Sequence, residues 1–289
     1  MFKKKKDQTY QSYWSISWNI FKKNKVAMVC LFIVILLCLI ALFAPLIASY
    51  DPNKQVLTDR LMKPCGQHWF GTDDLGRDIF SRIIYGCRVS LSVGIISQII
   101  ATVIGYTMGV CAGYYGGKVD SVISFLIQVF SSFPFLLFAM AIMFVLGPGL
   151  INLYLALGLL GWASTARLIR GDVMRLKKME YIDACKVSGG NSFRIIMKHL
   201  LPNCLSTLIV TVTLGIPNAI MSEASLSFLG LGVKAPMASW GSMISFSQPY
   251  IRSATYYSVI PGLAIIITVL AFNMLGDGLR DALDPKLRS

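Results

Sequence analysis

The long apolar runs of this 289-residue chain contain no charged residues, and charge is scarce throughout. Charged residues make up 14% of the chain, compared with about 25% in soluble globular domains. Hydrophobic residues make up 55%, which excludes an ordinary soluble globule and indicates a membrane protein. The net charge of +13 does not indicate nucleic-acid binding, because the Lys and Arg residues are divided among the segments between apolar runs.

Six runs contain no Asp, Glu, Lys, Arg or His: 26–48, 89–112, 122–146, 150–166, 204–222 and 257–275. Proton-coupled carriers and intramembrane proteases generally need ionisable groups at membrane depth, so both classes are disfavoured. The chain also lacks the G-x-x-x-x-G-K-[S/T] phosphate loop that binds ATP. If it moves a solute uphill, we expect another polypeptide to supply the free energy. We expect neither enzyme activity nor a bound cofactor in this chain.

No metal site is predicted. The seven cysteines form no C-x-x-C pair, and most lie in or beside apolar runs, where Cys commonly serves as a small hydrophobic residue. Only Cys65 and Cys87 could face an outer compartment, and a disulfide between them is the less favoured alternative. His68 and His199 have no Cys, Asp or Glu at ligand-like spacing.

Each apolar run is close to the roughly 20 residues that a spanning helix needs, which predicts an all-α membrane protein with six transmembrane helices. Gly147-Pro-Gly149 predicts a tight helical hairpin between the third and fourth spans. Nineteen of the 27 Lys and Arg residues fall on the side of the two termini, which predicts that both termini are cytoplasmic. The predicted segments are a cytoplasmic N-terminus (1–25), outer loops at 49–88 and 223–256, a core at 89–277 with an inner loop at 167–203, and a cytoplasmic tail (276–289).

Residues 180–203 form a charged segment between apolar runs, and their pattern predicts two short helices. Gly189 and Gly190 predict the break, Asn191 or Ser192 can cap the second helix, and Pro202 is expected to end it.

The second helix is expected to be amphipathic. Phe193, Ile196, Met197 and Leu200 fall at i, i+3, i+4 and i+7, which places them on one face. Such a face suits a groove on a partner or the inner membrane surface, and periodicity alone leaves both open.

This segment resembles the cytoplasmic "EAA" coupling loop of ABC-transporter permeases. The pattern Glu-Ala-Ala, three residues, Gly is matched by Asp183, Ala184, Cys185 and Gly189, and a Leu-Pro follows at Leu201. Asp replaces the usual Glu and Cys the second Ala, which keeps a carboxylate and a small side chain. The resemblance favours the partner alternative and implies that the loop docks on ATPase subunits through Glu180, Tyr181, Asp183, Ala184, Cys185, Gly189, Arg194 and Lys198.

The first outer loop carries alternating charges between His68 and Leu91. A helix is expected to start near Thr72, with Thr72 or Asp73 as its N-cap. Asp73, Asp74 and Asp78 alternate with Arg77 and Arg82, at spacings that permit local ion pairs. A packed, salt-bridged lid is the favoured interpretation, and direct contact with a substrate is the alternative.

Three blocks, at 68–91, 223–241 and 272–288, resemble the permease group that handles dipeptides, oligopeptides and nickel. The resemblance implies a type I ABC importer permease in a bacterial cytoplasmic membrane, working by alternating access. It implies a second homologous permease subunit, two ATPase subunits that use ATP and Mg²⁺, an extracytoplasmic binding protein, surrounding membrane lipid, and no nucleic acid. Peptides are the expected cargo, and nickel or a metal chelate is the alternative.

A solute path through uncharged spans must use neutral polar side chains, each of which could instead hold helices together. A stand-alone secondary carrier or channel is a rival class, and so is a membrane enzyme, although no span supplies a catalytic base. The candidate lining residues are Gln98, Gln128, Ser131, Ser132, Asn218 and Asn273.

Overall fold

The computed structural model describes residues 13–284, and this part is helical, with one isolated β-bridge between Thr72 and Asp78. Residues 1–12 of the predicted N-terminal segment and 285–289 of the predicted tail lie outside the described part. The helices are α1 (Tyr13–Lys23), α2 (Lys25–Leu42), α3 (Ala44–Ile47), α4 (Ile79–Tyr115), α5 (Gly117–Ser132), α6 (Phe135–Leu146), α7 (Leu150–Leu176), α8 (Glu180–Val187), α9 (Ser192–Ile195), α10 (Leu201–Phe228), α11 (Trp240–Ser247) and α12 (Thr255–Leu283). The turns η1 (Leu57–Asp59) and η3 (Gln248–Tyr250) are 3₁₀-helical, and η2 (Ile196–Leu200) is π-helical.

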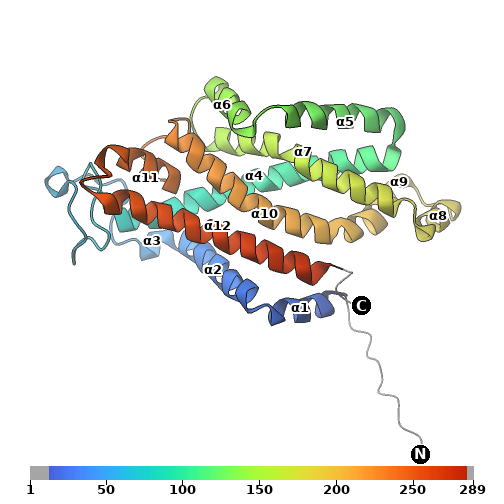
Figure 1. Cartoon of the computed structure of the whole chain (residues 1–289), viewed down its shortest axis with the longest axis horizontal. Helices are drawn as coiled ribbons and strands as arrows, with labels where there is room; N and C mark the ends of the chain where they lie inside the picture. The colour runs from blue at the N-terminus through green and yellow to red at the C-terminus, as the bar shows by residue number, and fades with distance from the viewer. Residues whose placement is uncertain (1–12, 285–289) are drawn as a thin grey trace, which may run out of the picture.

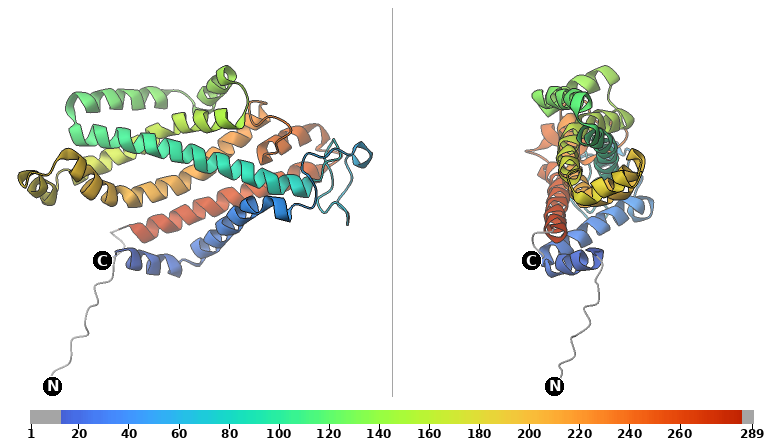
Figure 2. Two further views of the ribbon diagram at one scale, coloured as in Figure 1. Left: turned by 180° about the vertical axis from the view of Figure 1, so that it is seen from behind. Right: turned by 90° about the vertical axis from the view of Figure 1, so that its right-hand side faces the viewer.

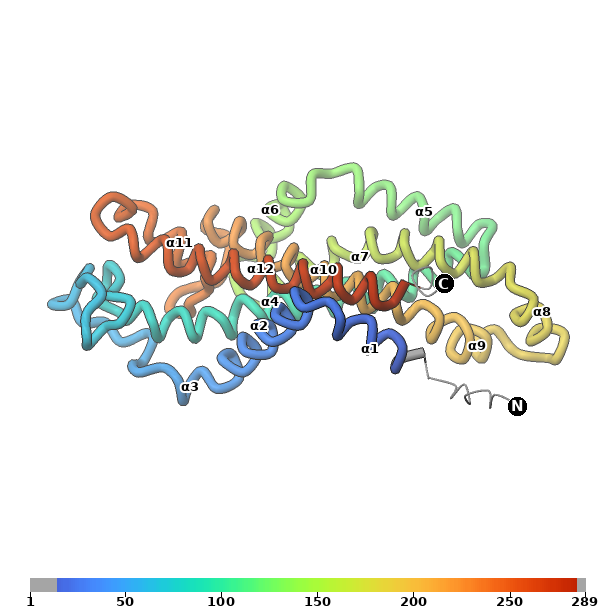
Figure 3. The backbone as a smooth tube through the Cα atoms, turned by 60° about the horizontal axis from the view of Figure 1, so that its bottom comes forward, coloured from blue at the N-terminus to red at the C-terminus, as the bar shows by residue number. Residues whose placement is uncertain are grey.

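The long helices α4, α7, α10 and α12 run along the length of the molecule (Figure 1). The loop between α3 and α4 lies with α11 at one end, whereas α8 and α9 project from the other. Figure 2 shows α5 and α6 on one side of this bundle and α2 on the opposite side. In Figure 3, α1 and the end of α12 lie toward the α8 end, so both described chain ends share a side with the predicted inner loop.

The helices are longer than the apolar runs that predicted them. The helix predicted from residue 89 begins ten residues earlier, at Ile79, and α7 and α12 each continue well beyond their uncharged runs. By length and composition four helices could cross a membrane, or five when the bent pair α5–α6 is counted as one span; α7 is not among them. The all-α membrane architecture is confirmed, and the number of six spans stays a prediction.

The run 122–146 is not one straight helix. It divides into α5 and α6, which meet at an angle of 90°. Pro134 is the cause, because proline disfavours helical geometry in the residue before it, and Phe133 is extended, with φ −91° and ψ 139°. The hairpin predicted at Gly147–Gly149 is confirmed: Asn152 donates its side-chain amide to Leu146 and Gly147 carbonyls across the turn.

Glycines bring α4 and α7 into close contact. A Cβ added to Gly105 would lie 2.6 Å from the Cβ of Thr165, and one added to Gly109 would lie 2.7 Å from the Ala166 carbonyl oxygen. Neither distance is compatible with a side chain larger than hydrogen. Small residues therefore fix the separation of the two helices, as in many membrane bundles.

The predicted outer loop is a packed, salt-bridged unit, and the predicted helix start near Thr72 is wrong. The helix begins at Ile79, and Asp78 is its N-cap, accepting a hydrogen bond from the Ser81 amide. Asp73 is fully buried and pairs with Arg77 at 2.6 Å, with Arg82 3.6 Å away. Asp73 instead accepts backbone hydrogen bonds within a turn, which explains why a cap-like residue precedes no helix.

Candidate functional site

The segment formed by α8, α9 and η2, called here the coupling segment (residues 180–200), projects from one end of the bundle (Figure 1). It is anchored by three apolar side chains, Ile182, Ile195 and Leu200, each at most 1% exposed. They pack in one core cluster with side chains from α4, α7 and α10, including Val110 and Val173. The segment is therefore packed directly against the ends of three long helices.

The break between α8 and α9 is confirmed at Gly189 and Gly190. Gly189 has a φ of +79°, and its N–H donates to the Lys186 carbonyl. The Gly190 N–H donates to the Cys185 carbonyl at 2.9 Å, which completes a Schellman motif. Asn191 then caps α9 by accepting from the Arg194 N–H, as one of the two predicted caps.

The predicted apolar face of the second helix is right at Leu200 and partly right at Ile196, but it is wrong at Phe193 and Met197. The predicted end at Pro202 is also wrong. Ile195 and Leu200 are the buried residues, whereas Phe193 and Met197 are exposed. The π-helical turn over 196–200 is the reason, because its wider repeat places residues five apart on the same side. Pro202 lies in the first turn of α10, where its missing N–H costs nothing.

The side of the coupling segment away from the bundle is exposed and partly apolar. Val187 is 89% exposed and Phe193 is 72% exposed, although both are large hydrophobic residues. An exposed apolar patch rimmed by charge is typical of a protein-binding surface. Of the candidate docking residues, Cys185 is half-buried, and Glu180, Tyr181, Asp183, Ala184, Gly189, Arg194 and Lys198 are exposed.

One polar contact and one ring contact join α8 to η2, which leads into α10. The Cys185 Sγ lies 3.3 Å from His199 Nε2, and the Tyr181 ring lies 6.1 Å from the His199 ring. The Asn203 side chain donates to the His199 carbonyl. His199, which the sequence left without a partner, therefore lies between α8 and the start of α10.

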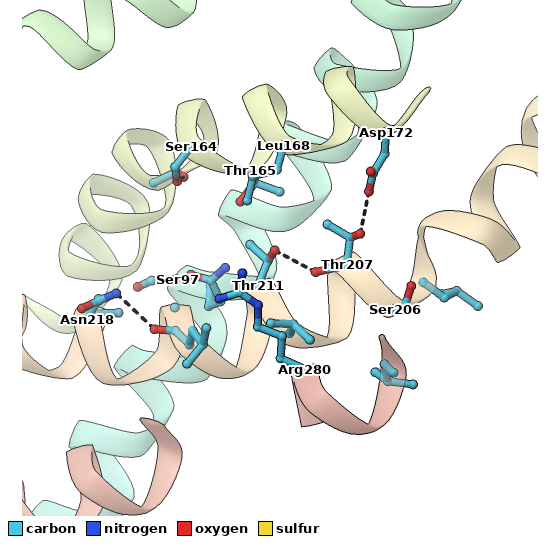
Figure 4. Close-up of a pocket in the computed structure, with 18 of the residues that line it drawn as sticks. Ser97, Ser164, Thr165, Leu168, Asp172, Ser206, Thr207, Thr211, Asn218 and Arg280 are labelled. Atoms are coloured by element: carbon cyan, nitrogen blue, oxygen red, sulfur yellow. Dashed lines mark hydrogen bonds between the residues drawn. The ribbon is translucent and has the colours of Figure 1, made fainter. Parts of the chain in front are cut away.

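A cavity of about 1500 Å³ opens between α4, α6, α7, α10 and α12. Figure 4 shows neutral polar side chains around it, from α4, α7 and α10. Several lining residues, including Leu168 and Met221, are exposed, so the cavity opens to the surface. The neutral polar residues of its lining include Ser97, Gln98, Thr165, Thr207, Thr211 and Asn218.

The predicted lining residues divide into two groups. Gln98 and Asn218 line the cavity, whereas Gln128, Ser131, Ser132 and Asn273 are not among its lining residues. Gln128 and Ser132 are exposed on α5, and Ser131 accepts a hydrogen bond from Arg167. Gln98 fills the crossing of α4 and α10, since a Cβ on Gly215 would lie 2.1 Å from its Oε1.

Several polar side chains on these helices donate to the backbone of their own helix. Thr211, for example, donates to the Thr207 carbonyl at 2.7 Å, and Asn218 donates to Leu214. Ser97 differs: its Oγ is buried and has no hydrogen-bond partner among residues 13–284. It lies near the middle of α4, and this unsatisfied hydroxyl is part of the cavity wall.

Charged residues line the cavity only near the α8 end, and sequence reasoning missed them. Asp172 and Arg175 come from the last turns of α7, and Arg280 and Asp284 from the end of α12. These residues lie outside the uncharged runs, because α7 and α12 both continue beyond them. Their helical continuation past those runs was the signal that could have found them.

His68 and Cys65 lie in the loop between α3 and α4, and Cys87 lies in α4. His68 Nδ1 lies 2.9 Å from Asp78 Oδ1, at the start of α4. Cys65 is exposed, Cys87 is buried, and both are free thiols. Within the described residues, no three or more His, Cys, Asp or Glu side chains are grouped so as to hold a metal ion.

Comparison with known proteins gives two family matches. Residues 102–289 match the family described as "binding-protein-dependent transport system inner membrane component". Residues 12–64 match the "N-terminal TM domain of oligopeptide transport permease C". The predicted resemblance to ABC importer permeases is therefore confirmed.

Similar proteins cover almost the whole chain. The dipeptide transport system permease protein DppC of Bacillus subtilis is 46% identical over 96% of this chain and 87% of its own length. The oligopeptide transport system permease protein OppC of the same organism is 42% identical, over 96% and 91%. The glutathione transport system permease protein GsiD of Pectobacterium atrosepticum is 41% identical, over 98% and 95%.

A solved structure of the MetNI methionine ABC transporter, in an inward-facing conformation, has the same fold. It superimposes with a TM-score of 0.57 at 19% identity, over 71% of this chain and 98% of that one. This likeness confirms the predicted type I importer permease fold.

Proposed function

Since this chain belongs to the family of binding-protein-dependent transport system inner membrane components, we propose that it is the permease subunit of an ATP-driven importer of short peptides. The names of the relatives support the cargo, because proteins 41–46% identical over nearly the whole chain are named as permeases for dipeptides, oligopeptides and glutathione. Nickel is the alternative cargo, and no relative named here supports it.

The observation that carries the mechanism is the geometry of the coupling segment. The side of the segment that faces the bundle is anchored by Ile182, Ile195 and Leu200, and the opposite side exposes Val187 and Phe193. A docked partner could therefore grip the exposed side and move α4, α7 and α10 through the buried side. This arrangement supports docking on two cytoplasmic ATPase subunits, which bind ATP and Mg²⁺ and hydrolyse the ATP, while this chain itself is no enzyme.

The cavity is this chain's part of the solute path in our proposal. Its walls at mid-depth are neutral and hydrogen-bonding, as at Gln98 and Asn218, which suits varied peptide side chains. A second homologous permease subunit completes the path, and an extracytoplasmic binding protein delivers the peptide at the end that carries α11. The complex lies in the cytoplasmic membrane with both termini inside, an orientation supported by the excess of Lys and Arg on that side.

In this proposal the coupling segment and the cavity work together in transport by alternating access. Closure of the ATPases pulls the coupling segments together, the bundle opens outward to accept peptide, and hydrolysis restores the inward-facing state. Because α4 and α7 are fixed together through Gly105 and Gly109, they are expected to move as one body.

The test is uptake of a labelled dipeptide into proteoliposomes that hold both permeases, both ATPases and the binding protein, with ATP. We expect accumulation that requires ATP and every subunit. Vesicles with this chain alone should accumulate nothing, and vigorous pumping by them would refute the proposal. Accumulation of ⁶³Ni²⁺ without peptide uptake would refute the peptide cargo and leave the importer class standing.

A further inference from the structure

The cavity contains one cation that the described protein does not neutralise. Arg280 projects from α12 into the cavity toward Thr211 (Figure 4). It makes no hydrogen bond or ion pair with any other residue in 13–284. By contrast, Arg175, on the same cavity, pairs with Asp172 at 3.4 Å.

The carboxylates of the cavity are engaged elsewhere. Asp172 accepts from Arg175 and from the hydroxyl of Thr207. Asp284, four residues beyond Arg280, also has an interaction of its own. The guanidinium of Arg280 thus faces a cavity whose lining carboxylates interact with other groups. An anion that enters the cavity could therefore form an ion pair with it.

The direction of the Arg280 side chain follows from the course of α12. Side chains of an α-helix lean toward its N-terminus, and α12 runs from the α11 end of the molecule toward the α8 end. Arg280 therefore leans back into the cavity, away from the chain end. The Arg280 side chain remains exposed, so a solute in the open cavity can reach it.

We propose that the cavity binds its peptide directly and that Arg280 is a contact residue for a carboxylate of that peptide. The inference rests on the proposed function and adds a contact by this chain to it. A planar guanidinium offers paired N–H donors that match a carboxylate, and every peptide with a free C-terminus carries one. The exposed side-chain amide of Asn218 lies on the wall of the same cavity and is available to the peptide backbone. The cavity volume of about 1500 Å³ accommodates a short peptide.

The test compares two cargoes in proteoliposomes holding the complete transporter: a labelled tripeptide with a free C-terminal carboxylate and the same tripeptide as its C-terminal amide. For each cargo the initial uptake rate of a variant is divided by the wild-type rate, so that any preference of the binding protein cancels. We expect Arg280→Gln to lower the free-acid rate about tenfold, as for a lost charge-assisted hydrogen bond. The amide rate should change less than about twofold. Arg280→Lys, which keeps the charge but loses the paired donors, should fall between the two.

Arg175→Gln is the matched control, because it removes a cation from the same cavity that already has a carboxylate partner. It should change both rates in the same proportion. Equal losses for acid and amide in Arg280→Gln, loss of ATPase copurification, or no loss for the acid would each overturn the contact. Failure of the wild-type complex to take up either peptide would instead refute the proposed function.

Discussion

Replacement of Gly189 tests whether the shape of the coupling segment matters for transport. Gly189 occupies the left-handed position of the Schellman motif, with φ +79°. A left-handed conformation costs an ordinary L-residue about 1–2 kcal/mol, and a β-branched residue is less tolerant still. A Cβ at this position would meet nothing within 4 Å, so the cost comes from the backbone and not from a collision.

The expected result of Gly189→Val is a protein that inserts normally but transports poorly. A penalty of about 1–2 kcal/mol shifts the local equilibrium between ordered and frayed segment by a factor of about 5–30. The ends of α8 and α9 then no longer hold a fixed angle for the ATPase. Peptide uptake should fall by a similar factor, while membrane level, measured by immunoblotting, stays near that of the wild type.

Gly189→Asn is the control, because asparagine tolerates the left-handed conformation better than other non-glycine residues. It should retain most of the uptake. Normal uptake by the valine variant at normal membrane level would refute the role of this turn. Equal defects in both variants would show that the side chain, and not the backbone conformation, is what the site rejects.

Two further substitutions test the anchoring of the two ends of the molecule. Ile182→Ala leaves a cavity at the fully buried anchor of α8 and should destabilise the coupling segment by about 2–5 kcal/mol, measured as faster amide hydrogen exchange in α8. Val187→Ala, at an exposed site, should leave the exchange unchanged. Equal exchange rates in the two variants would contradict the anchoring. Asp73→Asn removes the buried carboxylate that pairs with Arg77 and Arg82 and should destabilise the predicted outer loop by about 3–5 kcal/mol. The expected measurement is a lower thermal unfolding midpoint of the purified complex. An unchanged midpoint would show that other groups compensate the charges of the two arginines.

The sequence by itself determined the features that depend on neighbouring residues. Apolar length predicted membrane helices, because a bilayer leaves no other partner for the backbone. Gly189 and Asn191 predicted the break and the cap in the coupling segment, since both act within one turn of helix. The motif at Asp183–Gly189 identified the family from the sequence.

Only the tertiary structure decided which polar residues meet. The π-helical turn at 196–200 rotated the buried face of the second coupling helix, and the choice of that turn depends on the fit of Ile195 and Leu200 into a cluster from three distant helices. The cavity joins side chains more than a hundred residues apart, such as Gln98 and Asn218. Arg280 lines the cavity because α12 continues beyond its apolar run and its side chains point toward the N-terminus of the helix. No local sequence pattern predicts this position.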